Sequence, residues 1–267
     1  MARNRVRLAC LFAPLTAVLL LTAGCGSSDA ESGDGGHARD GAPVVVATTT
    51  WEGAFAKAAG AQDVRVIVPK SVQHAPDYDP KPSDLAAVAE ADFVLYAPFE
   101  PYAEKIKEAA GSDAELVEVN LDNDADKATA EVARLGKLFG TADVAASWQK
   151  TFGTQYAGLQ RELKAAWPGG KAPSVVTQVF TAWSAKMAGA DVVGTYGPEA
   201  VTAKQLSGLS AKKPALVLDN AHMSTGTVLP DSGAKQVKIV NYPGDDLDLL
   251  PVYRAAAAAV KAAMGGA

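Results

Sequence analysis

Cysteine, histidine and positive charge are all scarce in this chain. Its 267 residues include two Cys and three His, and 25 Lys and Arg stand against 30 Asp and Glu, for a net charge of −5. Because one of the two Cys, Cys10, lies in an apolar N-terminal run, the remaining chain has one thiol and no disulfide, and its core alone must hold the fold. An acidic chain without a basic cluster in its folded part repels phosphates, which excludes nucleic acid as a partner.

Sequence motifs of the common enzyme classes are also absent. The chain has no G-x-S-x-G, H-E-x-x-H or G-x-x-x-x-G-K-[ST] motif, and no G-x-G-x-x-G follows a strand-like run. A Ser or Thr can still meet a distant His in space, because catalytic triads assemble from separate segments. We therefore expect a protein that is not an enzyme, with an exported hydrolase as the remote alternative.

The first 25 residues have the pattern of an export signal. Three Arg lie within the first seven residues, and an apolar run, Leu8–Ala23, follows without any acidic residue. That run is shorter than the roughly 20 residues that a membrane-spanning helix needs. Small residues directly before Cys25 resemble a bacterial lipobox, which predicts cleavage after residue 24 and a lipid on the Cys25 thiol. The alternative is a signal that is simply removed and leaves Cys25 unmodified.

Residues 25–42 are predicted to be the lipidated Cys and a flexible tether. The stretch is rich in Gly, Ser and Asp, so it cannot bury enough apolar surface to fold, and its His37 should be solvated. Removing the signal, residues 1–24, takes away three Arg and no acid, which leaves 22 basic against 30 acidic groups, a net charge of −8. We expect a monomer, lipid-anchored at the outer face of a bacterial cytoplasmic membrane.

From residue 43 onward, β-branched runs alternate with helical patterns. Strands are expected at 44–50, 64–68, 93–97, 115–120, 174–179, 215–219 and 236–241. Such alternation predicts mostly parallel sheets covered by helices. Residues 126–170 contain no strand-like run. We therefore predict an α/β fold of two lobes, 43–125 and 171–267, joined by a linking helical segment at 126–170, with the ligand cleft between the lobes.

The linking segment carries a stripe of large apolar side chains. They recur every three or four residues and are Trp148, Phe152, Tyr156, Leu159, Leu163 and Trp167. This spacing places them on one face of a helix that ends at Pro168, and we interpret the face as part of the core rather than a cofactor site. The stretches 82–97 and 203–221 also resemble each other, since both run from a helix into a buried strand.

Polar residues follow the predicted strands. Because ligands of open α/β sheets bind beyond the carboxyl ends of the strands, these residues are candidates for the site. They include His74, Tyr78, Gln178, Asp219, Asn220, His222 and Asp245. Imidazole and carboxylate together suit zinc or manganese. Each has a structural alternative, because a loop His is often solvated, Asp and Asn commonly cap helices, and the YPGDD stretch fits a turn.

The stretches VVVATTTWEGAFAKAAGAQDVRVIVP and PDYDPKPSDLAAVAEADFVLYA resemble the N-terminal lobe of the zinc/manganese substrate-binding lipoproteins of ABC transporters. The Tyr-acid-Pro-x-Pro-Ser-Asp core, Tyr78–Asp84, is the most specific part, and fainter similarity in PALVLDNAHMS and IVNYPGDDLDLL extends the resemblance over residues 43–264. The resemblance implies a periplasmic-binding-protein-like fold with one long rigid helix between the lobes, zinc or manganese as the transported ligand, and an ABC transporter permease as the partner.

The metal ligands of that family are only partly matched. Its first His stands where this chain has Pro76, and its second His has no counterpart in NLDNDADKA. The residues at or near the ligand positions that the resemblance implies are His74, Gln178, Asp219, His222 and Asp245, with Asn241 close to the position of the family's last Asp.

Two interpretations of the ligand therefore stay open. In the first, a rearranged site with His74 and His222 coordinates zinc or manganese directly. In the second, the fold is retained but the cleft binds a metal chelate or a small organic molecule. The polar cleft residues would then be Tyr78, Gln178, Trp183, Asn220 and Asn241. We favour direct coordination, because imidazole and carboxylate groups converge on one edge.

Replacing Cys25 by Ala should release the protein from the membrane. Once the signal is removed, the lipid on that thiol would be the only hydrophobic anchor. Fractionation of membranes and soluble protein measures the effect. An Ala variant that loses its signal and still sediments with membranes contradicts lipid anchoring.

Overall fold

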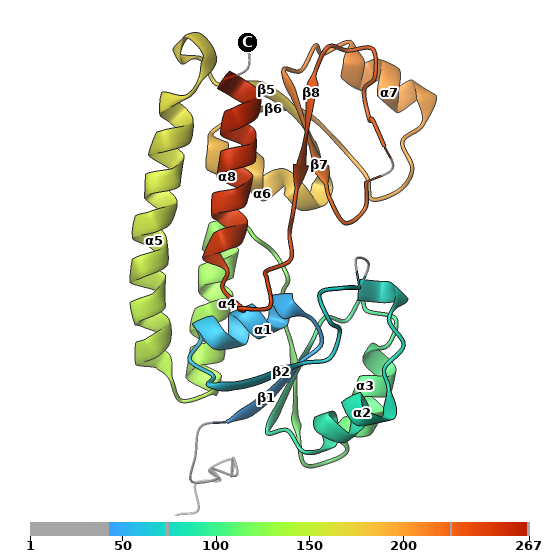
Figure 1. Ribbon diagram of the computed structural model, residues 1–267, viewed down its shortest axis with the longest axis vertical. Helices are drawn as coiled ribbons and strands as arrows, with labels where there is room; N and C mark the ends of the chain where they lie inside the picture. Colours follow the sequence, from blue (N-terminus) through green and yellow to red (C-terminus); the bar gives the residue numbers. More distant parts are fainter. Residues whose placement is uncertain (1–42, 73–74, 225, 266–267) are drawn as a thin grey trace, which may run out of the picture. The chain divides into compact units, whose positions relative to one another are not determined.

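The computed structural model describes residues 43–72, 75–224 and 226–265, all of which belong to one compact unit, 39–267 (Figure 1). The N-terminal lobe contains β1 (Val44–Ala47), α1 (Thr50–Ala58), β2 (Asp63–Val66), η1 (Ala75–Asp77), α2 (Pro82–Ala89), β3 (Phe93–Tyr96), α3 (Ala103–Ala110) and β4 (Glu115–Glu118). The linking segment contains α4 (Ala125–Leu138), α5 (Ala142–Ala165) and η2 (Pro168–Gly170). The C-terminal lobe contains β5 (Ser174–Gln178), η3 (Val179–Thr181), α6 (Ala182–Ala188), β6 (Asp191–Tyr196), α7 (Ala203–Ser210), β7 (Leu216–Asn220), β8 (Lys235–Ile239) and α8 (Leu250–Gly265).

Each lobe is built on a four-stranded parallel sheet. The strand order is β2-β1-β3-β4 in the first sheet and β6-β5-β7-β8 in the second, so the two lobes repeat one topology. This confirms the predicted fold class. It also explains the resemblance between 82–97 and 203–221, because α2–β3 and α7–β7 occupy equivalent places in the two sheets.

The start of α1 follows from a local sequence signal. Thr49 caps the helix by accepting a hydrogen bond from the Trp51 amide (3.1 Å), while the Glu52 carboxylate accepts from the Thr49 amide (3.1 Å). This is a capping box. It supplies acceptors for backbone N–H groups at the start of the helix that have no partner within the helix. A Cβ at Gly53, one residue later, would lie 3.2 Å from Leu247 Cδ2, so the glycine lets the chain after β8 pack closely on α1.

The linking segment contains two helices, of which α5 is the long helix between the lobes that the family resemblance implies. The chain turns between α4 and α5 at Gly140, which has a φ of +71°. With 24 residues, α5 is about 36 Å long. It contacts α1 and α4 at one end and α6 and α8 at the other, and in Figure 1 it runs beside both lobes. Among the described residues, no helix combines the length and the apolar character needed to cross a membrane.

The apolar stripe of the linking segment faces the core, as predicted. Phe152 and Leu163 are almost fully buried, and the other four members pack against the same hydrophobic cluster. This cluster is shared by both lobes, because it includes Val45 and Leu95 from the first sheet and Val175 and Leu218 from the second. Separate, smaller clusters lie beneath α2 and α3 in one lobe and beneath α7 in the other.

One strand, β6, was not expected from the sequence. Its Asp191 and Gly194 are residue types that strands disfavour. As an edge strand, β6 also has only one buried residue, Tyr196, so it lacks the run of buried residues that marks the central strands. A Cβ at Gly194 would lie 2.5 Å from Leu209 Cδ2, so glycine is what allows α7 to pack against this edge.

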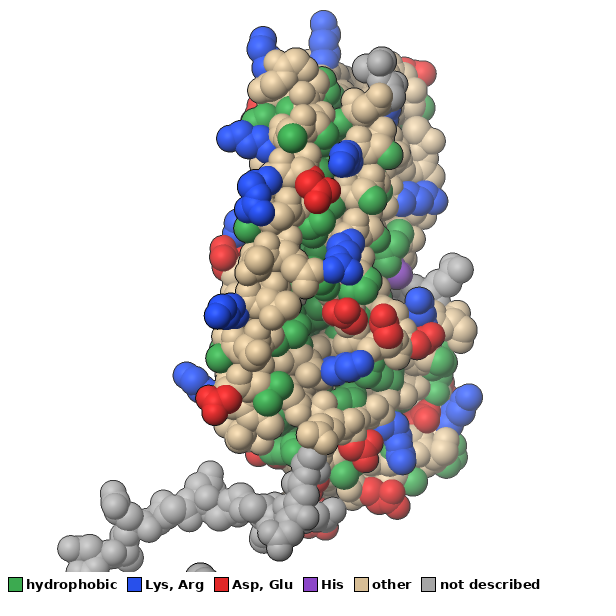
Figure 2. All heavy atoms as spheres, turned by 60° about the vertical axis from the view of Figure 1, so that its left-hand side comes forward, with side chains coloured by type: hydrophobic (Ala, Val, Ile, Leu, Met, Phe, Trp, Pro, Cys, Tyr) green, Lys and Arg blue, Asp and Glu red, His purple; other side chains and the backbone are tan. Residues whose placement is uncertain are grey.

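Charges on the face that includes α5 are mixed. Figure 2 shows Lys and Arg side chains interspersed with Asp, Glu and apolar side chains there, and no continuous basic surface forms on this face.

Replacing Phe152 by Ala should lower the free energy of unfolding by about 3–5 kcal/mol, because Phe152 stacks on Trp148 and Tyr156 and is 3% exposed. Thr154→Ala, at an exposed position of the same helix, should change it by less than about 0.5 kcal/mol. Urea unfolding followed by circular dichroism compares the two. Equal stability of both variants would remove the core role assigned to this helix face.

Candidate functional site

Two cavities lie between the lobes. The smaller has a volume of about 270 Å³ and the larger about 810 Å³, and both are lined by Ala75, His222 and Tyr242. The larger cavity is lined by residues that follow the ends of strands in both sheets. From the N-terminal lobe these include Phe99, Leu121, Asp122, Asn123 and Asp124, and from the C-terminal lobe Val179, Phe180, Pro198, Asn220, His222, Met223, Asn241 and Tyr242. The cleft thus occupies the carboxyl edge of both sheets, where ligands of such folds bind.

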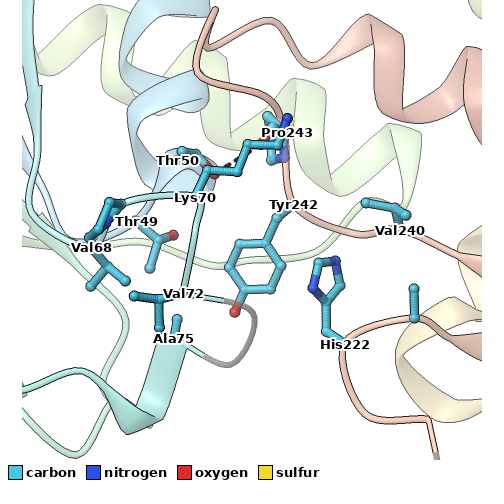
Figure 3. Close-up of a pocket in the computed structure, with 12 residues that line it drawn as sticks. Thr49, Thr50, Val68, Lys70, Val72, Ala75, His222, Val240, Tyr242 and Pro243 are labelled. Atoms are coloured by element: carbon cyan, nitrogen blue, oxygen red, sulfur yellow. Dashed lines mark hydrogen bonds between the residues drawn. The ribbon is translucent and has the colours of Figure 1, made fainter.

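Aromatic rings form the wall between the two cavities. The ring of Tyr242 makes edge contacts with His222 (centroids 4.7 Å apart) and with Trp51 (5.3 Å). Figure 3 shows the Tyr242 ring directed toward Val72 and Ala75, with the His222 ring beside it. Because Trp51 comes from α1 and the other two follow strands of the second sheet, this ladder of rings connects the lobes.

Polar contacts between residues that line the cavities also join the two halves of the cleft. Thr50 Oγ1 donates to the Pro243 carbonyl (3.0 Å), and Asn123 Nδ2 donates to the Asn241 carbonyl (2.9 Å). Lys186 Nζ on α6 contacts Asp124 (2.7 Å) at the start of α4.

The predicted site residues fall into two groups. Trp183, Asn220, His222 and Asn241 line the larger cavity, as expected from their positions after the strands. Trp183 Nε1 donates to Asn241 Oδ1 (2.9 Å), so these two side chains hold each other in the wall. His74 lies outside the described residues. The part of each residue in binding stays a prediction.

The other predicted residues are engaged elsewhere. Asp219 is buried and accepts hydrogen bonds from the Tyr196 hydroxyl (2.7 Å), the Ser224 hydroxyl (2.7 Å) and Gln236 Nε2 (2.9 Å). Gln178 Oε1 accepts from the Phe180 amide (2.7 Å) and so caps the turn after β5.

Tyr78 donates its hydroxyl hydrogen to Asp84 Oδ2 (2.7 Å), and Asp245 is exposed. Asp245 belongs to the turn whose next residue, Asp246, accepts a hydrogen bond from Lys57 Nζ (2.6 Å) through its carbonyl. Among residues 43–72, 75–224 and 226–265, no three His, Cys, Asp or Glu side chains are grouped so as to hold a metal ion.

Several residues of the cleft were not found from the sequence. Trp51, Phe99, Phe180 and Tyr242 supply most of its aromatic surface, and Asn123 supplies a buried amide. The signal that could have found them is their position directly after strands or at the start of α1. A pattern of metal-ligating residue types does not indicate them, because none of them is a usual metal ligand.

Two buried carboxyl groups, Glu52 and Glu100, lie next to the cleft. Burial, and for Glu100 also the charge of Glu52, raises the pKa of each. Glu100 accepts hydrogen bonds from the Ala97 amide (3.2 Å) and the Tyr102 hydroxyl (3.0 Å). Burial followed by the charges of both carboxyls also raises the pKa of Tyr242, which places the pair near the cleft wall. Because the pKa of both carboxyls is raised, the protonated forms are favoured near neutral pH, and the pair carries less negative charge than two ionised carboxylates would.

Residues 45–135 match the family model of ZnuA, zinc-uptake complex component A, periplasmic. This match confirms, over the N-terminal lobe and most of α4, the family resemblance seen in the sequence. A search of curated protein sequences gives no match.

Solved structures share the fold over both lobes. The laminin-binding protein Lmb of Streptococcus agalactiae, described as a bifunctional protein with adhesin and metal-transporting activity, aligns at 17% identity and a TM-score of 0.64, covering 83% of this chain and 99% of that one. FpvC of Pseudomonas aeruginosa in complex with Mn²⁺ aligns at 14% identity and a TM-score of 0.63, covering 83% and 97%. AdcAII of Streptococcus pneumoniae gives 17% identity and 0.60, covering 83% and 99%. At such identities the likeness shows the fold.

The buried carboxyl pair predicts how stability depends on pH. A carboxyl whose pKa is higher in the folded than in the unfolded chain stabilises the fold at low pH, and this contribution is lost as the pH rises through the folded pKa. The free energy of unfolding should therefore fall between pH 5 and pH 9, and Glu100→Gln should reduce the fall by at least about 1 kcal/mol. Urea titrations at pH 5, 7 and 9 measure it. Glu104→Gln, at an exposed site on α3, is the control and should keep the wild-type dependence of the free energy of unfolding on pH. A Glu100→Gln variant with that same dependence would refute the raised pKa of Glu100.

Proposed function

We propose that the chain is the extracytoplasmic substrate-binding component of an ABC importer and captures a divalent transition metal, zinc or manganese, in the cleft between its lobes. The observation that carries the proposal is the position of the cleft, which lies at the carboxyl ends of both parallel sheets in a chain whose N-terminal lobe matches a zinc-uptake component. The metals named for solved structures of the same fold, Mn²⁺ and Zn(II), support the choice of ligand class.

The anchor and the partner belong to the same proposal. Lipid on Cys25 would hold the protein at the outer face of the cytoplasmic membrane, and the permease of the importer would receive the ligand from the cleft. The family is described as a component of an uptake complex rather than as an enzyme. The repeated topology of the lobes supports a role in ligand binding, because it presents two equivalent sheet edges to one bound ligand.

Metal content tests the proposal. Protein purified from producing cells without added metal or chelator should contain about one equivalent of a transition metal by inductively coupled plasma mass spectrometry. His222→Ala should lower this content at least about fivefold, since His222 lines both cavities, and His74→Ala should do the same if the sequence-based assignment holds. His37→Ala in the predicted tether serves as the control and should leave it unchanged. Wild-type protein with no transition metal would refute metal capture.

A further inference from the structure

The larger cavity is much bigger than a metal ion requires. A water molecule accounts for about 30 Å³ of liquid, whereas this cavity has a volume of about 810 Å³. Cavities of roughly 300–1,000 Å³ are typical of sites for small organic molecules. Resting on the function proposed above, we propose that the cleft takes its metal as a complex with a small organic chelator that has flat unsaturated rings and little net charge.

Acidic side chains of the cavity are already neutralised. Asp122 contacts Lys127 Nζ (2.6 Å), and Asp124 contacts Lys186 Nζ (2.7 Å); all four residues line the cavity. The two acids and two bases cancel in charge. A bare divalent cation would have to displace a lysine to reach either carboxylate, whereas a complex that brings its own donor atoms need not.

The walls of the cavity are suited to flat rings. Phe99 is 63% exposed and follows β3, while Phe180 is 50% exposed and follows β5, so each lobe presents an uncovered ring to the same space. Trp51 and Trp183 add buried indole surface to the lining. Exposed aromatic surface is unfavourable in water, and a flat ligand gains both its burial and ring stacking.

Binding of defined probes to the purified full chain tests the inference. The probes are zinc ion alone, 8-hydroxyquinoline alone, the neutral flat zinc complex of two 8-hydroxyquinolinates, and the anionic zinc–EDTA complex. Equilibrium dialysis with metal and chelator analysis gives each affinity. The neutral complex should bind at least about tenfold more tightly than each of the other three.

Variants of the walls connect that affinity to the cavity. Phe180→Ala and Phe99→Ala should each weaken binding of the neutral complex at least about fivefold, because each removes an exposed ring of the lining. Val144→Ala, at a 52% exposed position of α5 outside the lining, is the matched control and should bind as wild type does. Thermal unfolding of each variant confirms that it is folded.

The remaining outcomes separate this inference from the proposed function. Zinc ion alone binding as tightly as the neutral complex overturns the inference and leaves metal capture standing. Free 8-hydroxyquinoline binding as tightly as its zinc complex also overturns it, because the metal would then not be carried. Failure of every probe to bind at about 100 micromolar, which corresponds to a weak complex of roughly −5.5 kcal/mol, overturns the inference as well. Metal capture is then decided by the metal content, which is measured separately.

Discussion

An aromatic cluster around Tyr253 joins the C-terminal lobe to the long linking helix α5. This residue of α8 is fully buried, and its ring contacts Phe152 (centroids 4.9 Å apart) and Tyr156 (5.8 Å) on α5 and Trp183 (5.1 Å) on α6. Protein interiors pack at the density of organic crystals, so such a cluster fixes the distance between the helices that contribute to it. Because α5 also contacts α1 and α4, the cluster couples the C-terminal lobe to the N-terminal one.

The geometry of the cleft depends on this cluster through Trp183. The Trp183 ring packs against the ring of Tyr253 in the aromatic cluster. The same side chain lines the larger cavity and donates its Nε1–H to Asn241. Asn241 in turn donates to the Phe180 carbonyl (3.2 Å), so the loop that presents Phe180 is tied to the core in two steps. The exposed rings of the cleft are therefore supported by buried, hydrogen-bonded residues.

Charge is kept low throughout the cleft. Lysines pair with the aspartates that line it, and burial raises the pKa of the neighbouring Glu52 and Glu100, which lowers the negative charge of this pair. The fold that this chain shares with Lmb and FpvC is here combined with a cleft lined largely by apolar and aromatic residues. A shared fold does not fix the chemistry of the cleft, which depends on the residues at the ends of the strands. In this chain these residues only partly match the metal ligands of the family that the sequence resembles.

The sequence by itself determined the two-lobed α/β architecture and the order of its elements apart from β6, because βα alternation and the helical stripe at residues 148–167 are local patterns. It also placed Asn220, His222 and Asn241 at a sheet edge, since the carboxyl ends of parallel strands share one side. Only the tertiary structure decided which of these residues face the cavity. Asp219 and Asn220 are neighbours in one strand, and their side chains alternate between faces, so Asn220 lines the cavity while Asp219 is held by Tyr196, Ser224 and Gln236. The presence of Phe99 and Phe180 in the lining of one cavity, and the proximity of Glu52 to Glu100, depend on contacts between distant segments that no local pattern encodes.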